Sequence, residues 1–225
     1  HIIGRSEGNV GKVSSVDLEE RDIGNLICPD QRCFVLLAAR QRNGDFFRVP
    51  GHMVVGQDVS VKILPVPGDL RVAGWDRAEI MAKTDGDDLQ LINSDAEVQA
   101  GCDEDLILYV PRQANLTIQK VTGDASLQAV QGPIRIGSVA GDLTMHDVGP
   151  VNFETVAGDA NLRQTGAVTA GSISGGFTLR KSSGPCAIET IGGDASIRDV
   201  KGEVAIQNVG SDLYMRHVHG SITVN

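Results

Sequence analysis

Large aromatic side chains, excess positive charge and long apolar runs are all scarce in this sequence. Aromatic residues make up 4% of the 225 residues while glycine occurs 27 times, a balance typical of narrow, repetitive β structure rather than of a bulky core. A formal net charge of −9 argues against nucleic-acid binding, although it leaves room for a local basic stripe. The longest apolar run, from Cys33 to Ala39, is far shorter than the ~20 residues that a transmembrane helix needs.

Catalytic and metal-binding motifs are also missing. There is no His-Glu-x-x-His segment, no phosphate-binding glycine loop before a helix and no Gly-x-Ser-x-Gly turn. We therefore expect no enzyme, no catalytic residue, no cofactor and no metal site, and we interpret the close pair His217 and His219 as surface side chains. An enzyme acting on polysaccharides ranks third among the functions, because Glu154 and Glu189 stand alone instead of in the carboxylate pair that such chemistry needs.

Cysteine is used sparingly, at four scattered positions that do not make a disulfide framework. Cys28 and Cys33 enclose the turn-like segment Pro-Asp-Gln-Arg, so a local disulfide between them is one interpretation and ordinary thiols are the other. The spacing alone leaves both open.

A repeat dominates the second half of the chain. From residue 123 onward glycine recurs in steps of nine residues, with two steps of eight and one gap, so about the last 105 residues contain about twelve copies of one nine-residue unit. Counted from each glycine, positions +2, +4 and +7 are apolar, as in Ala125, Leu127 and Val130. The exceptions are small: Thr165 and Ser182 occupy +7 positions.

This spacing predicts strands with one buried face. Apolar +2 and +4 alternate with polar +3 and +5, while +7 breaks the alternation, so the chain must bend after +5 and place an aliphatic side chain at the corner. Units opening with Gly-Asp alternate with units opening with Gly-Pro or a variant, which makes the full period 17–18 residues, or two strands per coil. We predict an all-β fold, a parallel β-solenoid (β-helix) with coils ~4.8 Å apart.

The predicted solenoid domain covers residues 59–225, with its clearest repeats at 123–225. Weaker alternating stretches such as Asp88-Leu-Gln-Leu and Asn115-Leu-Thr-Ile extend the pattern toward residue 59. Residues 1–58 lack the repeat and contain short apolar stretches between polar turns, which predicts a small β barrel or cap domain. Such a cap would cover the unpaired backbone groups of the first coil.

Several segments resemble known families. The Gly-Asp-x-x-Leu units ending in Val-x-Gly, preceded by Arg71-Val-Ala-Gly-Trp-Asp-Arg and Tyr109-Val-Pro-Arg, resemble the bacterial domain-of-unknown-function group labelled putative adhesins over roughly residues 60–225. That resemblance implies a surface-associated role and carries over no catalytic residue. The coils are also similar to those of bactofilins, which stack and polymerise end to end. The segments Ile3-Gly-Arg, Gly8-Asn-Val-Gly-Lys-Val13 and Arg48-Val-Pro50 resemble a PRC-barrel domain, a module often found in membrane-associated contexts.

The aspartates of the Gly-Asp units invite comparison with calcium-binding β-rolls, which share the nine-residue period. Those proteins need two glycines and an acid in each nonapeptide, whereas every second unit here lacks a regular acid. We interpret each aspartate instead as a turn cap that accepts hydrogen bonds from its own backbone amides.

The repeat also predicts which side chains share an outward column. If coils stack in register, four arginines at +5 of the Gly-Asp units form a row at ~5 Å intervals. Solvation with help from the neighbouring Asp147 and Asp199 is one interpretation. The other is an anionic partner, such as an acidic polysaccharide, a membrane surface or the acidic side of another copy, because the guanidinium fork suits carboxylate and phosphate. The candidate residues are His146, Arg163, Arg180, Arg198 and Arg216.

The alternate units and the end of the chain suggest a second kind of contact. At +3 and +6 the Gly-Pro units carry small, mostly neutral side chains, which are compatible with lateral packing or with a solvated surface. An open end is a template for strand addition, so head-to-tail assembly is one interpretation of the last residues and a shortened segment is the other. The residues of this end are Ile222, Thr223, Val224 and Asn225.

Together these patterns predict a structural or adhesive β-solenoid. We expect it to assemble with itself, head to tail or laterally, or to attach to the cell envelope. A cell-surface or extracellular location is favoured over an envelope-associated one in the cytoplasm. The alternative is a binding module that holds an acidic polysaccharide or another anionic surface through the arginine row.

Overall fold

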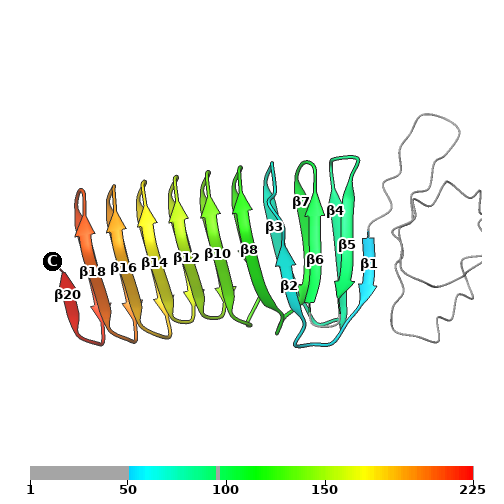
Figure 1. Ribbon diagram of the computed structural model, residues 1–225. Coiled ribbons are helices and arrows are strands. Elements are labelled where there is room, and N and C mark those ends of the chain that lie inside the picture. Colours follow the sequence, from blue (N-terminus) through cyan, green and yellow to red (C-terminus); the bar gives the residue numbers. More distant parts are fainter. Residues whose placement is uncertain (1–50, 95–96, 225) are drawn as a thin grey trace, which may run out of the picture. The chain divides into compact units, whose positions relative to one another are not determined.

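The chain folds into a stack of coils (Figure 1). Each regular coil contributes one strand to each of two sheets. The structure, a computed structural model, describes residues 51–94 and 97–224. All regular elements in these ranges are β-strands, which form two ten-stranded sheets. The all-β, parallel-solenoid prediction is therefore confirmed. Among the described residues there is no helix of the length and apolar character that crossing a membrane requires.

The two sheets are named A and B. Sheet A contains, in spatial order, β1 (Gly51–Val54), β4 (Glu79–Thr84), β7 (Leu106–Pro111), β3 (Leu70–Trp75), β9 (Ala125–Gln128), β11 (Leu143–Val148), β13 (Ala160–Thr165), β15 (Phe177–Ser182), β17 (Ala195–Val200) and β19 (Leu213–Val218). Sheet B contains β5 (Leu89–Ser94), β6 (Glu97–Cys102), β2 (Ser60–Ile63), β8 (Asn115–Val121), β10 (Ile134–Val139), β12 (Val151–Val156), β14 (Val168–Ile173), β16 (Cys186–Ile191), β18 (Val204–Val209) and β20 (Ile222–Val224).

The core is a set of inward columns between the two sheets. Equivalent positions pair from coil to coil, so Leu143 pairs with Ala160, which in turn pairs with Phe177. These +2, +4 and +7 side chains are buried along most of the stack, as the apolar pattern predicts. The two polar exceptions, Thr165 and Ser182, are buried as well, and the Ser182 hydroxyl donates to the Gly166 carbonyl at 2.7 Å.

The bend after +5 has a specific backbone cause. At +6 of the Gly-Asp units the residue adopts a left-handed conformation in coil after coil, although none of these residues is glycine. A left-handed residue reverses the alternation, so that +5 faces solvent and +7 returns to the core. The residues are Ala129 (φ 57°), Asp147 (φ 55°), Gln164 (φ 56°), Lys181 (φ 61°), Asp199 (φ 58°) and His217 (φ 54°).

The aspartates of the Gly-Asp units form a ladder along the stack. The Asp124 carboxylate accepts the backbone N–H of Asp142 at 2.8 Å, and the Asp142 carboxylate accepts that of Asp159 at 2.8 Å. These donors are 18 and 17 residues away in sequence, which confirms the predicted period. The expectation that each aspartate caps its own turn is therefore replaced by a link to the next coil, made possible because parallel stacking places equivalent amides one strand spacing away.

The first coils depart from sequential stacking. The β6–β7 coil lies beyond the β2–β3 coil, since β2 lies between β6 and β8 while β3 lies between β7 and β9. Strands β1, β4 and β5 run antiparallel to their neighbours. The alternation from Asp88 to Leu91 predicts an early parallel coil, and this prediction is wrong, because the stretch enters the antiparallel strand β5. Residues 112–114 carry the chain from β7 past the β2–β3 coil to β8.

The predicted cap domain at 1–58 stays a prediction for most of its length. Its described part contains β1, whose Gly51 and Val54 pair with Ala82 and Glu79 of β4 in sheet A. The PRC-barrel-like segments lie outside the described residues, and so do Cys28 and Cys33, for which a disulfide and ordinary thiols are the two interpretations.

Candidate functional site

The predicted arginine row exists as an in-register column on the outer face of sheet A. We call it the basic column. Strand pairing places His146 beside Arg163, Arg163 beside Arg180, and each later member beside the next. Neighbouring strands of a sheet are ~4.8 Å apart, so the cationic groups recur at that interval along the stack. The column consists of His146, Arg163, Arg180, Arg198 and Arg216.

These side chains are open to solvent and lack anionic partners. All are exposed except Arg198, which is half-buried. Within residues 51–94 and 97–224, no carboxylate oxygen lies within 4.0 Å of the four arginines. Asp147 and Asp199, which one interpretation of the row used as neutralising neighbours, bind elsewhere: Asp199 contacts His217 Nδ1 at 2.9 Å, and Asp147 accepts from Gln131. The cationic groups are thus available to an external ligand.

Two contacts orient the end of the column near β19. The Arg198 guanidinium lies 5.0 Å from the centre of the Tyr214 ring, in cation–π geometry that suits arginine. Arg216 Nε donates to His217 Nε2 at 3.4 Å. Tyr214 is 49% exposed, so its ring is open to solvent where it contacts this member of the column. Sequence reasoning missed this role for Tyr214, although its +3 position one coil beyond Arg198 was a usable signal.

A second outward column runs parallel to the first, at +3 of the same units. Its side chains carry hydroxyl or amide groups and pair in register, as the basic column does. Hydroxyls and amides can both donate and accept hydrogen bonds, which suits sugar hydroxyls beside a charged group. This polar column consists of Ser126, Thr144, Asn161, Thr178, Ser196 and Tyr214.

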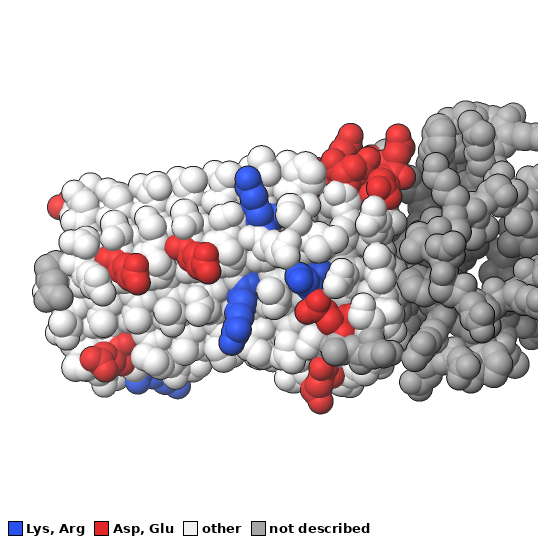
Figure 2. All heavy atoms as spheres, viewed as in Figure 1, with Lys and Arg blue, Asp and Glu red and all other residues white. Residues whose placement is uncertain are grey.

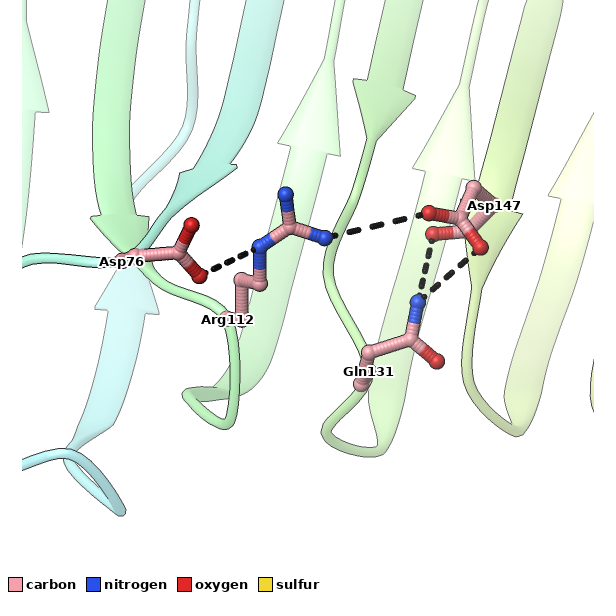
Figure 3. A network of polar contacts seen from close by, with 4 residues as sticks. All are labelled: Asp76, Arg112, Gln131 and Asp147. Atoms are coloured by element: carbon pink, nitrogen blue, oxygen red, sulfur yellow. Dashed lines mark hydrogen bonds and ion pairs between the residues drawn. The ribbon is translucent and has the colours of Figure 1, made fainter.

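Asp147 belongs to a network that fastens the crossover between β7 and β8 (Figure 3). Arg112 Nε lies 2.8 Å from Asp76 Oδ1, and its terminal nitrogen lies 4.0 Å from Asp147 Oδ2. Gln131 Nε2 donates to Asp147 Oδ1 at 3.1 Å. Trp75 pairs with Pro111 in the strand register, so the Gly-Trp-Asp and Val-Pro-Arg segments that carried the family resemblance meet here. Their role in this structure is to position the crossover.

Acidic side chains gather at the turns of β4–β7 (Figure 2). There, carboxylates cap backbone amides: Asp105 accepts the N–H of Asp69 at 2.8 Å, and Asp103 accepts those of Asp87 and Asp88. In the part of the chain that the structure describes, no group of three or more His, Cys, Asp or Glu side chains is arranged to hold a metal ion. We therefore interpret these carboxylates as caps of the backbone N–H groups in the turns.

The outer face of sheet B differs in character from that of sheet A. Figure 2 shows few charged side chains over β12–β20. A shallow groove of about 440 Å³, the sheet B groove, crosses β12, β14, β16 and β18. Gly171 lies between Glu154 and Glu189 along its lining, and neither glutamate contacts a cation or hydrogen-bond donor among the described residues. The +5 positions of the Gly-Pro units signalled this alternation of glycine and glutamate.

The remaining candidates lie apart from the basic column. Cys102 and Cys186 are free thiols, and burial raises the pKa of both, to about 12 for Cys186. At the predicted assembly end, β20 pairs with β18, and Ile222 and Val224 are 51% and 44% exposed. Asn225 lies outside the described residues. Self-association through this end stays a prediction.

Comparison with known proteins gives structural neighbours only. No family model and no curated protein matches the chain. A putative adhesin from Bacteroides fragilis is 11% identical, with a TM-score of 0.28, over 79% of this chain and 96% of its own. A putative lipid binding protein from Parabacteroides distasonis is 9% identical, with a TM-score of 0.34, over 81% and 98%. A putative cell adhesion protein from Clostridium sporogenes is 9% identical, with a TM-score of 0.25, over 79% and 100%.

Two of these three neighbours carry the adhesion description of the group that the sequence resembles. The predicted resemblance to the putative adhesins is thus matched among the structural neighbours. At 9–11% identity and TM-scores of 0.25–0.34 they carry no argument about any residue of the basic column. The chemistry of the two outer faces therefore has to be argued from this chain alone.

Proposed function

We propose that this protein is a non-enzymatic, adhesive β-solenoid that binds a linear polyanion, such as an acidic polysaccharide, along sheet A. The observation that supports the proposal is the basic column, whose four arginines recur once per coil without a carboxylate partner among the described residues. A cell-surface or extracellular location belongs to the same proposal, because acidic polysaccharides are met there.

The regular spacing favours a polymer over a small anion. Each coil adds one cation ~4.8 Å further along the stack, so a chain of acidic sugars lying along the column meets a new cation at each step. Guanidinium groups bind carboxylates in a planar, two-pronged geometry, and the polar column lies where sugar hydroxyls would fall. Individual exposed ion pairs contribute at most about 1 kcal/mol, so useful affinity requires several coils acting together.

Removal of the central arginines tests this function. In the variant Arg163→Ser/Arg180→Ser/Arg198→Ser we expect retention on immobilised polygalacturonate to fall at least about tenfold, since three pairs worth ~0.5 kcal/mol each are lost. Retention by the unaltered protein should weaken as salt rises toward about 0.5 M, because salt screens exposed charges. Affinity is measured by isothermal titration or by column retardation.

A matched control separates the column from net charge. The variant Lys62→Ser/Lys120→Ser/Arg135→Ser removes the same charge from strands β2, β8 and β10 of sheet B. It should retain binding to the polymer. Equal losses in the two variants, or undiminished binding after removal of the column arginines, would refute the proposed function.

A further inference from the structure

Over β12–β17, the outer faces of the two sheets carry unpaired charges of opposite sign. On sheet A the arginines of the basic column have no carboxylate within 4.0 Å among the described residues. On sheet B, Glu154 and Glu189 are exposed and have no cationic partner in the same residues. Because the faces point in opposite directions, these charges do not meet within one molecule.

The charges on the two faces also share one spacing. Glu154 and Glu189 belong to β12 and β16, which are separated by β14 alone. Arg163 and Arg198 belong to β13 and β17, which are separated by β15 alone. Both intervals are two strand spacings, ~10 Å, since every coil rises by the same amount. In two parallel copies of this solenoid, the arginines on sheet A of one copy therefore have the same spacing as the glutamates on sheet B of the other.

The middle positions match in shape as well. Between the glutamates, Gly171 leaves the sheet B groove open, and a side chain added there would collide with the backbone carbonyl of Glu154. Between the two arginines stands Arg180, which is long and exposed. A groove over glycine can receive such a side chain, while the flanking guanidinium groups reach the carboxylates.

We propose that a second copy of this chain occupies the sheet B groove, laying its sheet A face on sheet B. In this contact Arg163 and Arg198 of one copy pair with the two glutamates of the other, and Arg180 enters the groove above Gly171. The surrounding sheet B side chains are small, which permits close approach of two flat faces. They include Asn152, Thr169, Ala187 and Ala205.

Such a contact uses different surfaces on the two copies. It is heterologous and does not close on itself in a parallel stack, so it adds copies sideways into a ribbon. The net charge of −9 opposes association at low salt, while a Debye length of ~8 Å at 0.15 M screens that repulsion more than the short contacts across the interface. We therefore expect association to be strongest at moderate salt and to weaken again above about 0.5 M.

Charge reversal and complementation test the interface. The variant Glu154→Arg/Glu189→Arg makes both faces basic, and Arg163→Glu/Arg180→Glu/Arg198→Glu makes both acidic. Each variant alone should stay monomeric in sedimentation velocity runs at concentrations where the unaltered protein grows in mass. An equimolar mixture of the two should associate again, because each supplies the charge that the other has lost. A variant that had merely misfolded would not show this rescue, and circular dichroism checks the fold of each.

The control Asp58→Arg/Glu203→Arg changes the net charge by the same amount as the glutamate reversal, at exposed residues outside the strands. It should associate as the unaltered protein does. A protein that stays monomeric at every concentration and salt, or one that associates equally after the glutamate reversal, would overturn the proposal. Failure here leaves polyanion binding intact, since Glu154→Gln/Glu189→Gln should keep full retention on polygalacturonate.

Discussion

At the scale of single residues, Gly158, which precedes the ladder residue Asp159, is required by the coil packed against it. A Cβ at Gly158 would lie 2.7 Å from the Gly141 carbonyl oxygen and would meet the Asp142 carboxylate, which occupies the same space. The glycine therefore serves close approach between coils, because the ladder carboxylate and the neighbouring backbone leave no volume for a side chain.

Substitution of this glycine should weaken the fold. We expect Gly158→Ala to lower the free energy of unfolding by about 1–3 kcal/mol, since the added methyl group displaces the Asp142 carboxylate or the Gly141 peptide. At Gly56 an added Cβ meets no atom within 4 Å, so Gly56→Ala should be neutral or stabilising by up to about 1 kcal/mol. Urea unfolding of both variants measures the difference, and equal stability of the two would contradict the argument.

The sequence was sufficient to identify the residues of these columns but not their bonds. Position +1 of the Gly-Asp units could be recognised as a capping aspartate from the repeat alone. The donor that each carboxylate meets lies in another coil, and its identity depends on stacking that no single unit encodes. Tyr214 is similar, because its contact with Arg198 requires the register of β17 and β19.

At the scale of elements, the inward columns bury one ionisable group deep in the core. Cys186 of β16 pairs with Val168 on one side and Val204 on the other, and it is 1% exposed. Burial raises the pKa of its thiol from 9.0 to about 12, because the thiolate would lose its solvation there.

This pKa makes stability depend on pH in a defined window. Between about pH 9 and 12 the unfolded chain releases a proton that the folded chain keeps, so the free energy of unfolding falls by up to about 1.4 kcal/mol per pH unit. The variant Cys186→Val lacks this contribution, and valine already fits the column. We measure the free energy of unfolding of both proteins in urea. Between about pH 8 and about pH 10.5 we expect it to fall more in the unaltered protein than in Cys186→Val. Identical pH profiles would be evidence against a buried thiol at 186.

Strand positions followed from the sequence more readily than strand directions. Alternation of apolar and polar residues is the same in parallel and antiparallel strands, so nothing in Asp88-Leu-Gln-Leu distinguished β5 from the regular coils. The antiparallel direction becomes visible only in the pairing of β4 with β7 and of β5 with β6. The β4–β7 pairing joins segments more than 20 residues apart in sequence.

At the scale of the whole molecule, the aspartate ladder links the stack along its length but is interrupted once. Gly176 occupies the aspartate position of its unit, so the ladder that reaches it from Asp159 cannot pass to Asp194 through a side chain. It resumes with Asp194, whose carboxylate accepts the Asp212 N–H at 3.2 Å.

Restoring the missing carboxylate should stabilise the protein. A Cβ at Gly176 would lie 3.3 Å from the Asp194 carbonyl oxygen and 3.6 Å from Asp159 Oδ1, so a side chain fits once the Asp194 peptide shifts by a few tenths of an ångström. We expect Gly176→Asp to raise the free energy of unfolding by about 0.5–1.5 kcal/mol relative to Gly176→Ala, which lacks the acceptor. The gain should grow with salt, because a column of carboxylates repels itself. Thermal unfolding at two salt concentrations provides the measurement, and Gly176→Ala matching Gly176→Asp would speak against the ladder.

The candidate site was predictable to the extent that it is periodic. The members of the +5 column follow from the repeat length alone, because equivalent positions of successive coils align. Whether Asp147 and Asp199 neutralise it was not predictable, since both lie at the left-handed corner, where their side chains turn toward Gln131 and His217. The sheet B groove is lined by the +3 and +5 positions of several successive Gly-Pro units. Its existence could therefore be recognised only from the assembled fold.

The displaced order of the first coils bears on how the protein is made. Both neighbours of β2 and both neighbours of β3 are synthesised after them. The Asp69 carboxylate accepts a hydrogen bond from the backbone N–H of Asp124, which is synthesised 55 residues later. During translation this segment therefore leaves the ribosome with both edges open, whereas every coil after β9 emerges beside a finished template. The edges of this segment are therefore most exposed to pairing with other nascent chains before residue 128 has emerged.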